Sequence, residues 1–345
     1  MTQYLVTGGT GYLGRHLVRR LVEQGRDVRV LVRSGSDTTG LDGAELVTGD
    51  VTDTASLRAA VEGCHRVFHA AAETRDGQPE SVYAATNLKA VTDLLEMAPS
   101  LGVERVVHTS HYFAIGRTGE PRMAHDQVAE EYWTHDPGDM HDAHELSKYD
   151  AENEVNQRVS LGEPVLALIP TMMYGPEARP VSGRGDLAKG NRIVAMLAEH
   201  AAGGYPGVPG DGKQLWNMVH VEDVAAGHVA AMDAGEDGGE WPPPRWTHWH
   251  YILGGENVTA AGLFDLFGRS AGCSAPKTLG KGGLFGKLLG GHPYKGRSKE
   301  RFEMDSHCWA YTPAMAEADW GYTTRPLAEG LETTVAWMRE SGLIS

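Results

Sequence analysis

Three glycines near the start of the chain have the spacing of a phosphate-binding turn. Gly8, Gly11 and Gly14 stand three residues apart, between the apolar run of residues 4–7 and an amphipathic pattern. A glycine is needed at each of three places when a strand turns into a helix beside a pyrophosphate. These are the sharp turn itself, the point where the backbone approaches the phosphates, and the point where the helix packs on the strand. The helix N-terminus then offers N–H groups and a positive dipole end to the phosphates. The alternative is a tight turn without a ligand. The residues expected to hold a dinucleotide here are Gly8, Thr10, Gly11, Tyr12, Leu13 and Gly14.

Arginines near this turn favour a cofactor with a 2′-phosphate. Arg33 ends the second apolar run, about 20 residues after the glycines, where dinucleotide-binding folds select the ribose. An acidic side chain there binds the 2′-hydroxyl, whereas an arginine accepts a 2′-phosphate. Arg15 is expected to approach the same phosphate; the alternative is two solvated surface arginines. We therefore expect NADPH (NADP) as the cofactor.

A carboxylate follows the third apolar run, in TGDVTD. Asp50 is expected to accept a hydrogen bond from the adenine amino group, with Val51 beside it. The alternative is a role for Asp50 as N-cap of the helix that follows Asp53.

Apolar, β-branched runs alternate with helical patterns over the first half of the chain. The predicted strands are Tyr4–Thr7, Val28–Val32, Glu45–Thr48, Arg66–His69, Val103–Thr109 and Val165–Ile169. The predicted helices are Tyr12–Gln24, Thr54–Val61, Val82–Leu101 and His144–Leu161. This alternation predicts an α/β fold with a doubly wound parallel sheet and helices on both faces. Ligands of such sheets bind outside the carboxyl ends of the strands.

The second half of the chain is richer in glycine, proline and charge. Loops are predicted over residues 175–192, 203–213, 236–250 and 279–297. Helices predicted over Val219–Ala231 and Arg325–Glu340 are expected to pack back on the main sheet. The expected domains are 1–170 for the NADP-binding domain, with 217–235 returning to it, and 171–216 with 236–345 for a smaller, mainly substrate-binding α/β region.

Composition excludes several classes of partner. The 345 residues carry a formal net charge of −15, which disfavours nucleic acid and anionic membranes. Three cysteines, far apart and odd in number, favour neither a disulfide framework nor a cysteine metal site, and they fit a reducing cytoplasm. No cleavable leader and no bilayer-spanning apolar segment is evident. We therefore expect a cytoplasmic protein that binds a small molecule.

Two stretches are rich in histidine, one of them also in aspartate, and both residue types are metal-ligand types. Zinc sites need ligands that converge, usually with cysteine or a fixed i, i+4 pair, and neither stretch shows such a pair with a third ligand. No metal is therefore expected. The residues concerned are His135, Asp139, His141, Asp142 and His144 in one stretch, and His248 and His250 in the other.

Ordered motifs along the chain resemble one enzyme family. They are TGGTGYLG, GDVTD, VFHAAA, TNLKAV, SKYDAENEV, IPTMMYGP and NMVHVEDVA. Together they resemble the extended short-chain dehydrogenase/reductase family, of the NAD-dependent epimerase/dehydratase type. The resemblance implies a Rossmann domain with a small C-terminal substrate domain, and NAD(P)-dependent chemistry at a carbonyl or carbinol. It places Ala70, Ala71 and Ala72 along the cofactor groove, Asn87 in support of the site, and Pro170, Met172 and Met173 beside the nicotinamide.

The catalytic helix departs from the family's pattern. The family carries a tyrosine four residues before its lysine, so that both lie on one helix face and the ammonium lowers the phenol pKa. Lys148 matches the lysine, but His144 stands at the tyrosine position. After the fifth strand, where the family has serine, HTSHYFAIG places His111, with Ser110 directly before it. The candidate catalytic residues are therefore Lys148, His144, His111 and Ser110.

Three interpretations of this departure stay open. In the first, His144 acts as general acid, although a nearby Lys148 ammonium disfavours its imidazolium form. In the second, the proton comes from water or from the substrate, as when a ketone is polarised by its own phenolic hydroxyl and mainly needs positioning. In the third, the protein only senses NADP(H).

These observations predict an NADPH-dependent ketoreductase that reduces a bulky, aromatic polyketide ketone in antibiotic biosynthesis without the usual tyrosine. The alternatives are a nucleotide-sugar epimerase or dehydratase, which needs that tyrosine as base, and a non-catalytic NADP(H)-binding regulator. The segment Ala84–Met97 resembles the family's dimer helices, so both a monomer and a homodimer stay open. The apolar residues expected near the substrate are Met123, Met140, Met172, Met173, Tyr174, Trp216, Trp241, Trp246 and Phe285.

Overall fold

Seven parallel strands form the main sheet of the computed structural model, in the order β3-β2-β1-β4-β5-β6-β9. The structure describes residues 3–75, 77–118, 128–131, 143–176, 191–235, 241, 250–279 and 299–345. The strands are β1 (Gln3–Thr7), β2 (Asp27–Val32), β3 (Glu45–Thr48), β4 (Arg66–His69), β5 (Arg105–Thr109), β6 (Val165–Pro170) and β9 (His250–Leu253). Strand order reverses between β1 and β4, which is the switch point where such sheets bind ligands.

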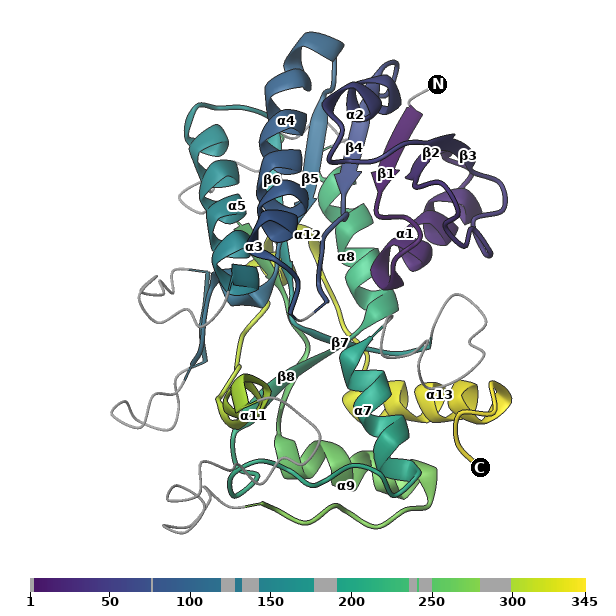
Figure 1. Cartoon of the computed structure of the whole chain (residues 1–345), viewed down its shortest axis with the longest axis vertical. Coiled ribbons are helices and arrows are strands. Elements are labelled where there is room, and N and C mark those ends of the chain that lie inside the picture. The colour runs from purple at the N-terminus through teal and green to yellow at the C-terminus, as the bar shows by residue number, and fades with distance from the viewer. Residues whose placement is uncertain are drawn as a thin grey trace.

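Helices cover both faces of this sheet (Figure 1). One face packs against α1 (Tyr12–Glu23), α8 (Val221–Asp233) and α12 (Ala314–Trp320), around buried residues such as Leu17 and Val224. The other face packs against α2 (Thr54–Val61), α4 (Ala90–Met97) and α5 (Ala143–Ser160), around residues such as Leu94 and Val155. The doubly wound α/β fold expected from the sequence is confirmed.

Short segments join these helices and strands. They are α3 (Glu80–Tyr83), a π-helical segment (Ala84–Lys89), and 3₁₀ turns at Pro99–Leu101 and Tyr112–Ala114. The single helix predicted over Val82–Leu101 is therefore divided into several pieces, because a wide π turn and a proline interrupt it.

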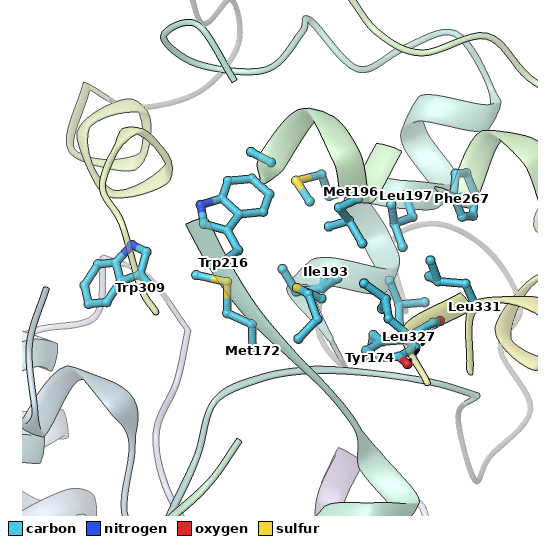
Figure 2. Packing of buried hydrophobic residues seen from close by; sticks show 14 of the residues in the cluster. Met172, Tyr174, Ile193, Met196, Leu197, Trp216, Phe267, Trp309, Leu327 and Leu331 are labelled. Carbon is cyan, nitrogen blue, oxygen red and sulfur yellow. Dashed lines mark hydrogen bonds between the residues drawn. The ribbon is translucent and has the colours of Figure 1, made fainter. Parts of the chain in front are cut away.

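A smaller sheet of three strands lies beyond the carboxyl ends of the main strands, in the lower part of Figure 1. Its order is β10-β8-β7, with β7 (Met172–Tyr174), β8 (Leu215–His220) and β10 (Glu256–Thr259). The helices around it are α7 (Arg192–Ala201), α9 (Ala260–Ala271), α11 (Lys299–Ser306) and α13 (Leu327–Glu340). Figure 2 shows their shared core, in which Met172 and Ile193 lie near Trp216 and Trp309.

Two expectations about the second half need correction. The predicted helix Arg325–Glu340 forms as α13, but it packs against α9 and β8 rather than the main sheet, because Leu331 and Val335 join the core of the smaller region. Helix α8 does return to the main sheet beside α1, whereas β8 within the same predicted segment belongs to the smaller sheet. Strand β9 and helix α12, from the expected substrate region, also complete the main fold.

Candidate functional site

The glycine turn lies at the switch point and leaves no room for side chains. Gly8 has φ +73, and a Cβ there would lie 2.6 Å from the carbonyl of Ala70 and from the nitrogen of Ala71. A Cβ on Gly14 would lie 2.1 Å from the oxygen of Gly8. Three backbone segments therefore pack tightly against one another here: β1, α1 and the segment after β4. Their main-chain groups are exposed to a ligand that binds at the turn.

A cleft of about 1480 Å³ opens from this turn along the carboxyl ends of the strands. Its volume exceeds the roughly 300–1,000 Å³ of ordinary small-molecule pockets, so it has room for a dinucleotide and a second ligand. The expected site residues that line it are Gly8, Thr10, Gly11, Tyr12, Leu13, Gly14, Arg33, Asp50, Val51, Ala70, Ala71, Ala72, Ser110, His111, His144, Lys148, Pro170, Met172 and Met173.

Of the two arginines, one lines the cleft and the other is used inside the fold. Arg33 is exposed at the edge of the cleft. Arg15 is buried, and its guanidinium donates to the backbone oxygens of Thr10, Asp37 and Thr39. The structure therefore does not place Arg15 beside a 2′-phosphate. Arg15 instead joins the glycine turn to the loop after β2.

Asp50 lines the cleft and does not cap a helix. Its carboxylate accepts from the backbone nitrogen of Thr52 at 2.9 Å and from the Thr52 hydroxyl at 2.8 Å. Asp53 is the N-cap of α2 and accepts from the backbone nitrogen of Ala55 at 3.0 Å. The alternative role of Asp50 as N-cap is therefore wrong, and its carboxylate is available at the cleft wall.

Lys148 projects from α5 into the cleft and is 3% exposed. None of the described residues accepts a hydrogen bond from its ammonium. Burial lowers the pKa of Lys148 to about 8, against the opposing effect of the Glu152 carboxylate. The Ser110 hydroxyl is also buried, lines the cleft and has no partner among the described residues. Both groups can therefore bond to a ligand without losing a contact in the fold.

His111, His144 and Phe113 line one wall of the cleft, and Tyr83 packs against His144. The ring of His144 is parallel to that of Tyr83, with centroids 5.2 Å apart and 8° between planes, and it meets Phe113 edge-on at 5.4 Å. The His111 ring lies 5.8 Å from that of His144. Both expected histidines therefore lie close together at the cleft.

His111 is held as a neutral imidazole. Burial, followed by the charges of His144 and Lys148, lowers its pKa well below the ordinary value. Its Nδ1 accepts from the backbone nitrogen of Phe113 at 3.2 Å, so Nε2 carries the hydrogen. His111 can donate a hydrogen bond from Nε2, but it has no second proton to transfer at neutral pH.

Asn87 supports the wall from behind and does not line the cleft. Its Oδ1 accepts from the Glu73 nitrogen at 2.7 Å, and its Nδ2 donates to the Glu73 oxygen at 3.1 Å. Nδ2 also lies 2.9 Å from the Ser147 hydroxyl, which donates to the backbone oxygen of His144 at 2.8 Å. This network joins the loop after β4 to α5 and so positions His144.

Helix α7 lines a part of the cleft that the sequence did not indicate. Arg192, Ala195, Met196 and Glu199 follow one another at helical spacing and line the cleft from one face of α7. Asn191 caps the helix by accepting from the backbone nitrogen of Val194 at 2.8 Å. The Asn cap, followed by the apolar residues Ile193, Met196 and Leu197 at i, i+3, i+4 spacing, is the signal that could have revealed this helix.

The apolar residues expected near the substrate divide into three groups. Met172 and Met173 line the cleft. Tyr174 and Trp216 are buried in the core of the smaller region, and Trp241 packs beside Arg105 and donates to the oxygen of Ala231. Met123, Met140, Trp246 and Phe285 lie outside the described residues.

The histidine-rich stretches are only partly described. Asp139, Asp142, His135, His141 and His248 lie outside the described residues. Within the described ranges, no group of three or more His, Cys, Asp or Glu side chains is arranged to hold a metal ion. No helix of the described part is long and apolar enough to cross a bilayer.

Comparisons with known proteins agree with this geometry. The model of the NAD dependent epimerase/dehydratase family matches residues 4–242. The chain is 33% identical to "Sterol demethylase protein B" of Methylococcus capsulatus over 281 residues, 79% of this chain and 76% of that protein. It is 28% identical to the 4-hydroxy-2-methyl-3-oxo-4-farnesyl-3,4-dihydroquinoline-1-oxide ketoreductase of Stigmatella aurantiaca over 235 residues, 68% of this chain and 65% of that one. The crystal structure of gox2253 superposes with a TM-score of 0.79 at 27% identity over 100% of both chains. The chain belongs to the NAD dependent epimerase/dehydratase family of extended short-chain dehydrogenases/reductases.

Proposed function

We propose that this protein is an NADPH-dependent ketoreductase that reduces a bulky aromatic ketone. The observation that carries the proposal is the cleft, in which the glycine turn and the buried Lys148 lie with two histidines and no tyrosine at the proton-handling positions. NADPH, when bound, supplies the hydride. The close backbone approach at Gly8 and the partnerless hydroxyl of Ser110 both fit a ligand of that kind.

Each part of the cleft has a role in holding the cofactor. The glycine turn and the N-terminus of α1 bind the pyrophosphate. Arg33 binds the 2′-phosphate, and Asp50 with Val51 faces the adenine. Lys148 binds the nicotinamide ribose through its ammonium, while Ala70, Ala71 and Ala72 leave the groove open. Pro170, Met172 and Met173 lie against the nicotinamide.

The proton comes from the substrate or from water rather than from His144. The His144 ring is stacked between aromatic neighbours, and His111 is neutral with its hydrogen on Nε2. His111 and Ser110 therefore hydrogen bond to the carbonyl oxygen and orient it. A ketone with a peri-phenolic hydroxyl is already polarised by its internal hydrogen bond, so orientation is the main contribution that remains for the enzyme.

A fused-ring ketone fits the space and the relatives. The apolar face of Met172, Met196 and Ile193 lies at the substrate end, and methionine adapts to flat ligands. The Stigmatella relative is a ketoreductase of a substituted dihydroquinoline. We propose a polycyclic polyketide of the angucyclinone class as substrate, acted on in the cytoplasm during antibiotic biosynthesis.

An epimerase or dehydratase role is disfavoured by the same wall. Those reactions need a base that removes a proton from a sugar hydroxyl, and His144 in its aromatic stack replaces the family's tyrosine. A purely regulatory role would leave the large substrate end of the cleft without a purpose.

The test is NADPH consumption against a panel of peri-hydroxy aromatic ketones, with product analysis. Turnover of at least one ketone with NADPH, and slower turnover with NADH, is expected. Micromolar NADPH binding without turnover of any carbonyl would contradict the enzyme proposal, and sugar-nucleotide turnover would favour the alternative.

A further inference from the structure

A buried histidine–carboxylate pair lies one helical turn beyond Lys148. Glu152 follows Lys148 by four residues on α5, so both side chains project from one helix face, and both are buried. His250, at the start of β9, has its Nδ1 2.9 Å from Oε1 of Glu152. The other carboxylate oxygen, Oε2, is buried and has no hydrogen-bond partner among the described residues. Two basic side chains therefore flank one carboxylate.

The second nitrogen of His250 shows how many protons the pair holds. Nε2 lies 3.0 Å from the backbone oxygen of Glu131. A carbonyl oxygen only accepts, so Nε2 carries a hydrogen and donates it. The 2.9 Å contact between Nδ1 and Glu152 then requires a proton between them, because a bare lone pair and a carboxylate would repel. The pair holds one proton more than a neutral imidazole and a carboxylate do, and its net charge is zero.

The surroundings place that proton on the imidazole. Burial alone lowers the pKa of His250, but the hydrogen bond and charge of Glu152 and the charge of Glu131 outweigh it, so the pKa is raised. Glu131 is itself buried, and burial raises its pKa, although its Oε1 accepts from the Ile252 nitrogen at 3.1 Å. Glu130 adds a negative charge beside Glu131.

The other groups around Lys148 carry no compensating charge. His69 and His108 stack in the sheet with centroids 5.7 Å apart; burial lowers the pKa of His69 to about 3 and that of His108 well below its ordinary value. His111 is neutral for the same reason. Among the described residues, Glu152 is the acidic group that acts on Lys148.

We propose that Glu152 and His250 act together as a carboxylate–imidazolium pair of zero net charge, and that this pair sets the charge of Lys148 when the cofactor binds. This inference rests on the proposed function, because it takes Lys148 as a ligand of the cofactor. The carboxylate attracts the ammonium, and the imidazolium behind it weakens that attraction. Lys148 is therefore poised between its charged and neutral forms near pH 8. Glu152 and His250 are positioning residues that act through Lys148.

Two variants distinguish this proposal from a merely structural role, because they should shift the charge state of Lys148 in opposite directions. His250→Gln leaves Glu152 as a bare carboxylate and favours the ammonium, whereas Glu152→Gln removes the charge and disfavours it. The affinity of each protein for NADPH is measured by fluorescence, without ketone, across pH 6–10. In the unaltered protein this affinity should fall as the pH rises through about 8. We expect the midpoint to rise by about one pH unit in His250→Gln and to fall by about one unit in Glu152→Gln.

His65→Gln is the matched control, since His65 lies at the amino end of β4, away from the cleft. It should leave the midpoint unchanged. Midpoints that move in the same direction in both test variants, or that do not move, would overturn the proposal. In addition, ¹⁵N NMR of the unaltered protein at pH 7 should show His250 as imidazolium, and a neutral ring would also overturn it. If the unaltered protein bound no NADPH, the proposed function would fail, while the NMR result would still decide the state of the pair.

Discussion

The ring of His144, which lies on α5 four residues before Lys148, is parallel to the ring of Tyr83. The centroids are 5.2 Å apart with 8° between the planes. An aromatic stack of this kind is satisfied by the shape of the ring and does not require a titrating nitrogen. His144 is therefore interpreted as part of an aromatic wall that shapes the cleft.

Replacement of His144 by Phe tests this interpretation. Phenylalanine keeps the stack on Tyr83 and removes the nitrogens, so we expect kcat/KM for the ketone to stay within about 3-fold. A general acid would be worth about 10²–10⁴-fold. A loss in that range, with the fold intact by circular dichroism, would show that His144 donates the proton.

Arg33 should decide the choice between cofactors. Arg33→Ala removes the guanidinium that we propose binds the 2′-phosphate, and a charged hydrogen bond of this type is worth about 1.5–3 kcal/mol. The KM for NADPH should rise by roughly 10- to 100-fold, and the KM for NADH should change by less than about 2-fold. Arg20→Ala is the control, because Arg20 is exposed on α1 and does not line the cleft. Equal effects of Arg33→Ala on both cofactors would contradict the assignment.

The buried ammonium of Lys148 should lower the free energy of unfolding, although the side chain serves the proposed function. Its folded pKa, about 8, lies below the ordinary lysine value of 10.5, so the penalty for the buried charge is present in full below pH 8. The penalty disappears as the pH rises from about 8 to 10.5, because only the unfolded chain binds the proton in that window.

Lys148→Met should therefore unfold at higher urea concentration at pH 7 without cofactor, by up to about 3 kcal/mol, and this gain should shrink by pH 10. Binding of NADPH should be weakened in the same variant. A variant that is less stable than the original protein at pH 7 would show that the buried ammonium does not destabilise the fold.

The main sheet was predictable because its signals are local. Val28–Val32 and Glu45–Thr48 are short β-branched runs, and the glycine turn ties β1 to α1 through backbone contacts that only glycine allows. Helix α7 was not predicted, because residues 193–202, between the two loops predicted over 175–192 and 203–213, were assigned to no element. Strands β7 and β10 are too short to show a period of their own.

The site was less accessible from sequence wherever it depends on tertiary contacts. Arg15 follows Gly14 directly, and adjacency suggested a phosphate ligand, but the loop at Asp37 and Thr39 folds over it and uses its guanidinium. The pairing of Glu152 with His250 joins residues 98 positions apart, and no local pattern indicates it. Lys148, by contrast, was identifiable from its motif, and it lies in the cleft.

The most direct measurement compares one peri-hydroxy aromatic ketone with its O-methyl ether. Both should bind in the same cleft, but only the free phenol polarises its own carbonyl. The account predicts that kcat for NADPH-dependent reduction falls by at least about 10²-fold for the ether, while its affinity changes little. Reduction of both ketones at similar kcat would contradict the account, because polarisation of the carbonyl by the substrate's own hydroxyl would then contribute nothing to the rate.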